Sequence, residues 1–248
     1  MGSIDLIVNG DDFGRSAGIN RGILECFDHG LLTSASLMTV WPASAAAAAA
    51  ALERPELSVG LHLDLGEWAF REDAWECTYL RVPLDDEAAI RAETERQLRV
   101  FRRLLDRDPS HLDSHQHVHR GEPARTILRE LGDELGIPVR HESRVRYRGD
   151  FFGQSNLGEP QHMSLSIGAF ISVLATLVPG VTELACHPGY ADDLVTSYRD
   201  ERAIEVETLC DDRVQRALDD LGIRLVSFLD TATPAGVRSP AATQSQPV

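Results

Sequence analysis

Lysine is missing from this chain, and all 24 of its basic residues are arginines. Schiff-base aldolases, pyridoxal-phosphate enzymes and Walker-type nucleotide-binding loops each need a lysine amine, so the sequence excludes these three classes. Basic residues are also fewer than acidic ones, since the 39 acidic residues against 24 arginines leave a formal net charge of −15. A chain of this sign is poorly suited to nucleic acid or to an anionic membrane surface, and we expect neither as a partner.

Cysteines and long apolar runs are scarce as well. The chain has four cysteines: Cys26, Cys77, Cys186 and Cys210. Their spacing fits neither a disulfide framework nor a zinc ribbon, so we interpret them as buried apolar residues. No apolar run approaches the ~18 residues of a membrane-spanning helix. The first residues lack the basic region of a secretory signal, and we expect a cytoplasmic protein.

Short apolar runs alternate with longer helical segments along the 248 residues. Strands are expected at residues 4–8, 34–40, 58–63, 111–114, 139–141, 182–186 and 224–228. Helices are expected at residues 19–29, 45–51, 85–105, 123–135, 165–177, 199–209 and 211–221. Such alternation predicts a parallel sheet with right-handed crossovers.

A distorted (β/α) TIM-like barrel of about seven strands, in a single domain over residues 1–230, fits this length best. A doubly wound open sheet is the alternative. Residues 64–83 and 142–162 interrupt the alternation without a clear period, and we interpret them as functional excursions beside the pocket. Residues 231–248 are rich in Ala, Pro, Thr, Ser and Gln, which predicts a disordered tail.

Histidines gather in one short stretch. The run His111-Leu112-Asp113-Ser114-His115-Gln116-His117-Val118-His119 holds four of the nine histidines of the chain. In an extended strand, alternate side chains of this run point to one face, and in a helix His115 and His119 lie one turn apart. Imidazole and carboxylate are common ligands of catalytic metals, so the run predicts a metal or catalytic site.

Polar residues also follow several of the expected strands at their carboxyl ends. Asp11 and Asp12 follow the first strand, His62 ends the third, His115 follows the fourth, and His187 follows the sixth. Reactive residues of (β/α) barrels lie at this end of the strands. Regular alternation would point Asp11 and Asp12 in opposite directions, so we expect them to differ in role, one binding a metal and one taking a proton. A simple turn is the alternative for this pair.

The segment Gly14-Arg15-Ser16-Ala17-Gly18 matches the G-x-S-x-G pattern of serine hydrolases. A true nucleophile elbow places its serine directly at the strand-to-helix turn, whereas here two aspartates intervene. We therefore interpret Ser16 as the N-cap of the following helix.

Five segments of this chain occur in the order of a known family. They are Asn9-Gly10-Asp11-Asp12-Phe13-Gly14, Thr33-Ser34-Ala35-Ser36-Leu37-Met38, Gly60-Leu61-His62-Leu63, Asp113-Ser114-His115-Gln116-His117-Val118-His119 and His187-Pro188-Gly189-Tyr190. Together they resemble the YdjC/ChbG family of carbohydrate deacetylases over nearly the whole chain. The resemblance implies a distorted (β/α) barrel, one divalent metal ion (magnesium or zinc) and removal of acetyl groups from N-acetylglucosamine units, such as those of chitin oligosaccharides. Gly10 departs from the usual alanine, and residues 64–83 and 142–162 are poorly matched.

The resemblance also implies roles for individual residues. Asp12, His62 and His115 would bind the metal, Asp11 would be the general base, and His187 would be held protonated as the proton donor. His117, His119 and Tyr190 would contact the substrate or support the site. Trp68 and Trp75, in the first excursion, are candidates for stacking on a sugar ring.

The expected reaction is hydrolysis of an N-acetyl amide on a small sugar substrate. A metal-dependent isomerase, epimerase or aldolase on the same barrel is one alternative, and a non-catalytic sugar-binding protein is another. The pair Asp11 and His187 favours an enzyme, because binding alone needs neither an acid nor a base. The oligomeric state stays open, with residues 165–177 as a candidate surface for pairing subunits in a homo-oligomer.

Overall fold

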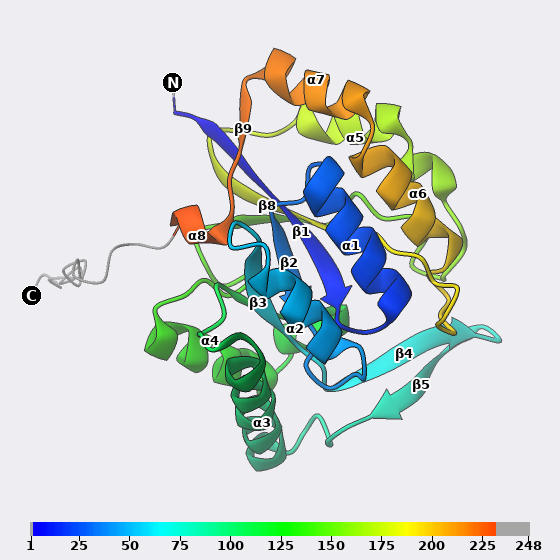
Figure 1. Ribbon diagram of the computed structural model, residues 1–248. Helices are drawn as coiled ribbons and strands as arrows, with labels where there is room; N and C mark the ends of the chain where they lie inside the picture. The colour runs from blue at the N-terminus through cyan, green and yellow to red at the C-terminus, as the bar shows by residue number, and fades with distance from the viewer. Residues whose placement is uncertain (1, 232–248) are drawn as a thin grey trace, which may run out of the picture.

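The computed structural model describes residues 2–231, and its centre is a curled parallel sheet of seven strands (Figure 1). The strand order is β6-β3-β2-β1-β8-β7, with β9 paired beside the first half of β1. The strands are β1 (Ile4–Phe13), β2 (Ser34–Leu37), β3 (Ser58–Leu63), β6 (Leu112–Ser114), β7 (Arg146–Arg148), β8 (Gly180–Cys186) and β9 (Ile223–Leu225). Every pairing within this sheet is parallel, as the strand and helix alternation predicts.

Helices surround the sheet and bury its outer face (Figure 1). They are α1 (Ala17–His29), α2 (Ser44–Leu52), α3 (Glu87–Leu105), α4 (Ala124–Leu135), α5 (Ile167–Leu174), α6 (Asp200–Leu209), α7 (Asp212–Leu221) and α8 (Phe228–Thr231), with 3₁₀ turns η1 (His115–Arg120) and η2 (His162–Leu165). Within residues 2–231, β6 and β7 do not pair, so the barrel stays open between them. The prediction of a single distorted barrel of about seven strands is confirmed.

Local signals explain where the first helix begins. The Ser16 hydroxyl accepts a hydrogen bond from the Ile19 backbone N–H at 3.2 Å, which confirms its interpretation as the N-cap of α1. The same hydroxyl donates to Asp193 at 2.8 Å. Ser16 therefore connects α1 to the loop after β8.

The excursion at residues 64–83 is more regular than we expected. It forms an antiparallel hairpin of β4 (Gly66–Arg71) and β5 (Ala74–Leu80), with Glu72 and Asp73 at positive φ in the turn. These two dihedrals give the twisted turn that suits two-residue hairpins. Most of β5 is exposed on both faces, although Trp75, Cys77 and Tyr79 alternate with Glu76 and Thr78 along it. This period of two, beside the turn at Glu72 and Asp73, was a usable signal for a strand, and our interpretation of residues 64–83 as lacking a clear period missed it.

Several smaller expectations need correction. The expected strand at 139–141 is a single bridge between Val139 and Leu112, whereas the second excursion contributes β7 to the sheet. The expected strand at 224–228 ends at Leu225. Cys77 is exposed on the hairpin, and Cys210 is only partly buried, so the interpretation of all four cysteines as buried was wrong for these two.

The structure also bears on the expected tail, on the expected subunit surface and on membrane spans. Thr231 ends α8, and the rest of the predicted tail at 231–248 lies outside the described residues. The segment 165–177 buries Phe170 and Leu174 against the core, so these side chains are not available to a second copy. Between residues 2 and 231, no helix has the length and apolar character of a membrane span.

Candidate metal and catalytic site

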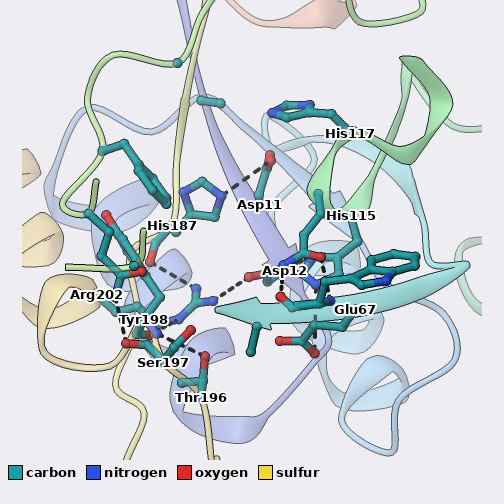
Figure 2. Close-up of a pocket in the computed structure, with 18 of the residues that line it drawn as sticks. Asp11, Asp12, Glu67, His115, His117, His187, Thr196, Ser197, Tyr198 and Arg202 are labelled. Atoms are coloured by element: carbon teal, nitrogen blue, oxygen red, sulfur yellow. Dashed lines mark hydrogen bonds and ion pairs between the residues drawn. The ribbon is translucent and has the colours of Figure 1, made fainter. Parts of the chain in front are cut away.

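A cavity of about 310 Å³ opens at the carboxyl ends of the strands (Figure 2). Its wall includes five of the residues singled out in the sequence: Asp11, Asp12, His62, His115 and His187. They come from β1, from β3, from the start of η1 and from the residue after β8. Residues up to 176 positions apart in the chain thus meet because parallel strands end at one edge of the sheet.

An irregularity in β1 turns both aspartates into this cavity. The pairing of β1 with β2 shifts register between Gly10 and Phe13, and Asp12 adopts a positive φ of 69°. A regular strand would point Asp11 and Asp12 to opposite faces, whereas here both side chains line the same cavity. The expected opposition of their directions was therefore wrong, and the bulge is the reason.

Asp12, His62 and His115 form a buried group, which we call the Asp12 cluster, with ligand atoms within 4.8 Å of one another. Asp12 Oδ1 lies 3.1 Å from His115 Nδ1 and 3.6 Å from His62 Nε2. Asp12 Oδ2 accepts a hydrogen bond from Arg202 at 2.5 Å, but Oδ1 is buried and has no hydrogen-bond partner among the described residues. This oxygen and the two imidazole nitrogens that face it form a ligand set that fits a divalent cation such as zinc.

His62 is oriented from behind by a carboxylate. Its Nδ1 lies 2.8 Å from Asp113 Oδ1, which leaves Nε2 facing Asp12. Although burial opposes the charge, Asp113 and Asp11 raise the pKa of His62 to about 10. Carboxylates in this position commonly fix the tautomer and direction of a metal-binding histidine. The sequence analysis did not predict that Asp113 orients His62.

A second buried group, which we call the Arg140 cluster, adjoins the first. The Arg140 guanidinium pairs with Asp11 at 2.7 Å, with Asp113 at 2.8 Å and with Glu183 at 2.6 Å. Although burial disfavours the charged forms, this ion pairing raises the pKa of Arg140 and lowers that of Asp11. Asp11, His62 and Asp113 could also approach one ion, but the guanidinium already supplies the positive charge there.

His187 lies opposite the Asp12 cluster, with Nε2 3.9 Å from Asp11 Oδ2 (Figure 2). Its backbone N–H donates to the Glu205 carboxylate, and its ring contacts those of Phe152 and Tyr198. Burial lowers the pKa of His187 to about 4. The imidazole is therefore neutral near pH 7 before substrate binds, in contrast to the protonated state that the resemblance implied.

The remaining candidates differ in position. His117 and Trp68 line the cavity, and His117 Nε2 lies 3.1 Å from the Tyr147 hydroxyl. His119 and Tyr190 do not line it. His119 is buried between Ser114 and the backbone carbonyl of Arg140, and Tyr190 donates its hydroxyl to Glu25 on α1.

Other residues of the site were missed in the sequence. Arg140 directly follows Val139 at a sheet edge, so its place at a strand end was a usable signal. Arg202 lies on α6 and donates a hydrogen bond to Asp12, and no local sequence pattern indicates that contact. Glu67 lines the cavity from the hairpin, which the sequence analysis did not predict as a hairpin.

Aromatic side chains form two walls of the cavity. Trp68, Phe70 and Trp75 contribute from the hairpin, and Phe152 and Tyr198 stack on the other side with ring centroids 4.7 Å apart. Trp75 is 58 % exposed and Phe152 is 36 % exposed, which is unusual for side chains of this size. Apolar faces of this kind suit the flat, apolar sides of a ring-shaped ligand.

Comparisons with known proteins agree with this architecture. The model of a family described as YdjC-like protein matches residues 5–220. A carbohydrate deacetylase of Geobacillus stearothermophilus is 32% identical over 90% of this chain and 96% of its own length. A chitooligosaccharide deacetylase of Proteus mirabilis is 30% identical over 91% of this chain and 98% of its own. A crystal structure from Enterococcus faecalis, of a candidate cellobiose-phosphate cleavage protein, has a TM-score of 0.75 at 24% identity, covering 93% of this chain and 100% of that one.

Proposed function

The chain belongs to the YdjC-like protein family, and on that premise we propose that it is a carbohydrate deacetylase, a hydrolase that removes the acetyl group from N-acetylated sugars such as chitooligosaccharides. The names of the curated relatives support the reaction class. The single observation that carries the proposal is the buried oxygen of Asp12, which has no hydrogen-bond partner within residues 2–231 and faces two imidazoles beside Asp11 and His187 in one cavity.

One divalent ion, magnesium or zinc, would be held by Asp12, His62 and His115. When bound, such an ion lowers the pKa of a water molecule and polarises an acetyl carbonyl. Arg202 on Oδ2 of Asp12 and Asp113 on Nδ1 of His62 keep both ligands directed at the same point. Their hydrogen bonds fix the ligand geometry in advance, which is the usual function of residues behind a metal ligand.

Asp11 would act as the general base. Arg140 holds its carboxylate ionised through two hydrogen bonds of 2.7 and 2.8 Å, so it is ready to accept a proton from water. The water oxygen then bonds to the acetyl carbon, and the carbon–nitrogen bond breaks. The amine needs a proton to leave, because an amide anion is far too basic a leaving group.

His187 would deliver that proton. Its Nε2 lies 3.9 Å from Asp11 Oδ2 on the cavity side, so the proton taken by Asp11 can pass to His187 and then to the departing amine. The net change is one water consumed, one acetate released and one amine formed. In this relay the neutral His187 collects its proton during the reaction, which replaces the resting imidazolium of the sequence-based mechanism.

The test is acetate release. Purified protein is stripped of metal, refilled with magnesium, zinc or manganese, and assayed on N-acetylglucosamine, chitobiose, chitotriose and an O-acetylated sugar. We expect acetate from at least one N-acetylated substrate in a refilled sample and none from the stripped protein. Absence of acetate with every metal and every substrate would contradict the proposal. Conversion of the sugar without acetate would favour the isomerase alternative.

A further inference from the structure

The β4–β5 hairpin is fastened to two segments that carry residues of the Asp12 cluster. Glu67 Oε2 accepts a hydrogen bond from Arg15 Nη2 at 2.6 Å, and Arg15 lies three residues after Asp12. The side-chain amide of Gln116, the neighbour of His115, makes two hydrogen bonds of 2.8 Å with the backbone of Trp68. The start of the hairpin is therefore tied by hydrogen bonds to the segments that carry Asp12 and His115.

The ring of His115 lies between this hairpin and Asp12. Its Nδ1 faces Asp12 Oδ1 at 3.1 Å, whereas its Nε2 faces Arg15 Nη1 at 3.4 Å and Glu67 Oε2 at 4.0 Å. A guanidinium can only donate hydrogen bonds. Without an ion, Nε2 is thus the acceptor of the ring, and the proton sits on Nδ1, on the Asp12 side but without hydrogen-bond geometry to Oδ1.

Metal binding through Nδ1 requires the other tautomer. A neutral imidazole that ligates a cation through one nitrogen carries its proton on the other, and that N–H usually donates to a carboxylate or carbonyl. In this protein, an N–H on Nε2 would oppose the N–H of Arg15. Glu67 is then the acceptor at hand, because its carboxylate lies 4.0 Å away and is only 14% exposed.

We propose that Glu67 is a positioning residue for His115, which accepts the Nε2–H of that ring when the Asp12 cluster holds a divalent ion. The proton leaves Nδ1 and appears on Nε2 by exchange with water, so the net charge of the ring does not change. Ion binding and seating of the hairpin therefore favour each other, as linkage between two coupled events requires. This inference rests on the ion site of the proposed function.

The first test measures ion affinity without substrate. Metal-free wild type, Glu67→Gln and Glu76→Gln are titrated with zinc alone by calorimetry. Glu76 is a matched control, because it lies on the same hairpin, is exposed and does not line the cavity. We expect Glu67→Gln to bind zinc about tenfold or more weakly, within the 10–100-fold range typical of residues behind a metal ligand. Glu76→Gln should bind like wild type.

The second test uses wild-type protein and does not depend on the folding of a variant. Hydrogen exchange of residues 66–80 is measured with and without zinc. Zinc should slow exchange in the hairpin of the wild type.

Equal zinc affinity of Glu67→Gln and Glu76→Gln, or hairpin exchange that zinc leaves unchanged, would overturn the role of Glu67 alone. A wild type that binds no divalent ion would overturn both this role and the ion site. Acetate release is scored separately, so the two failures are distinguishable.

Discussion

Two groups of acidic and histidine side chains lie side by side under the cavity, and both contain or contact His62. In the Asp12 cluster, one carboxylate oxygen is buried without a hydrogen-bond partner among the described residues. In the Arg140 cluster, a guanidinium from the chain pairs with Asp11, Asp113 and Glu183. The donor atoms of both groups have the types and spacings that a metal ion needs.

The difference between them is the source of positive charge. A buried carboxylate needs a cation or several hydrogen bonds, since an unpaired buried charge is costly. Arg140 meets this need permanently for one cluster, whereas Arg202 meets it only for one oxygen of Asp12. Ligand types and distances therefore do not separate the two clusters. The Asp12 oxygen without a hydrogen-bond partner among the described residues does, and it makes the Asp12 cluster the candidate metal site.

Removing the negative charge of Asp12 should have the largest effect. Asp12→Asn replaces a carboxylate ligand by a neutral amide, so we expect zinc binding to be lost in calorimetry. A bound ion stabilises the transition state by several kcal/mol, and each 1.36 kcal/mol is tenfold, so acetate release should fall roughly 10³-fold or more. Asp85→Asn, an exposed position outside the cavity, serves as the control. An Asp12→Asn protein that binds zinc like this control would exclude Asp12 as a ligand.

Removing the internal cation should act on folding rather than on ion binding alone. Arg140→Met leaves Asp11, Asp113 and Glu183 together in a buried place, and breaking a buried pair in this way typically destabilises a protein by about 3–5 kcal/mol. Urea unfolding of the variant measures the loss. Arg125→Met is the control, since the Arg125 side chain is 51% exposed and should cost at most about 1 kcal/mol. Equal losses in the two variants would show that Arg140 does not stabilise the buried carboxylates.

The contrast between the clusters also separates what the sequence reveals from what it does not. Alternating strands and helices predict the parallel sheet, and the carboxyl ends of its strands carry Asp11, Asp12, His62 and His187 toward one place. This much follows from order along the chain, because parallel topology fixes which ends of the strands meet.

The arginines that pair with Asp11 and Asp12 cannot be predicted from the order of strands and helices along the chain. Arg140 and Arg202 reach the aspartates from 129 and 190 residues away. Arg140 is marked only by its place at a strand end, and Arg202 is one of 24 arginines without a local mark. The bulge that turns Asp12 inward depends on pairing with β2, which propensity does not encode. The hairpin lies outside the main sheet and β5 is mostly exposed, so the alternation along β5 does not mark a face buried in the core.

A smaller effect is expected where the two clusters meet. Asp113 contacts both, through His62 in one and Arg140 in the other. Asp113→Asn keeps an acceptor for the His62 ring but loses the charge, so zinc affinity should fall about 10–100-fold, as for other residues behind a metal ligand. Calorimetry against Asp85→Asn measures this change. Unaltered affinity would mean that His62 keeps its direction without the Asp113 carboxylate.

The smallest effect is expected for Ser16, which lies outside both clusters and tests whether the chemistry belongs to the Asp12 cluster. Ser16 belongs to a segment with the pattern of a serine nucleophile, yet its hydroxyl caps α1 and bonds Asp193. Loss of an N-cap usually costs about 1 kcal/mol, so Ser16→Ala should lower the free energy of unfolding by that amount in urea. Acetate release at saturating substrate should stay within about twofold of wild type, since the reaction proposed here needs no hydroxyl nucleophile. A loss of activity comparable to that of Asp12→Asn, in a protein that is still folded, would transfer the chemistry from the Asp12 cluster to Ser16 and end the proposal of water as the attacking group.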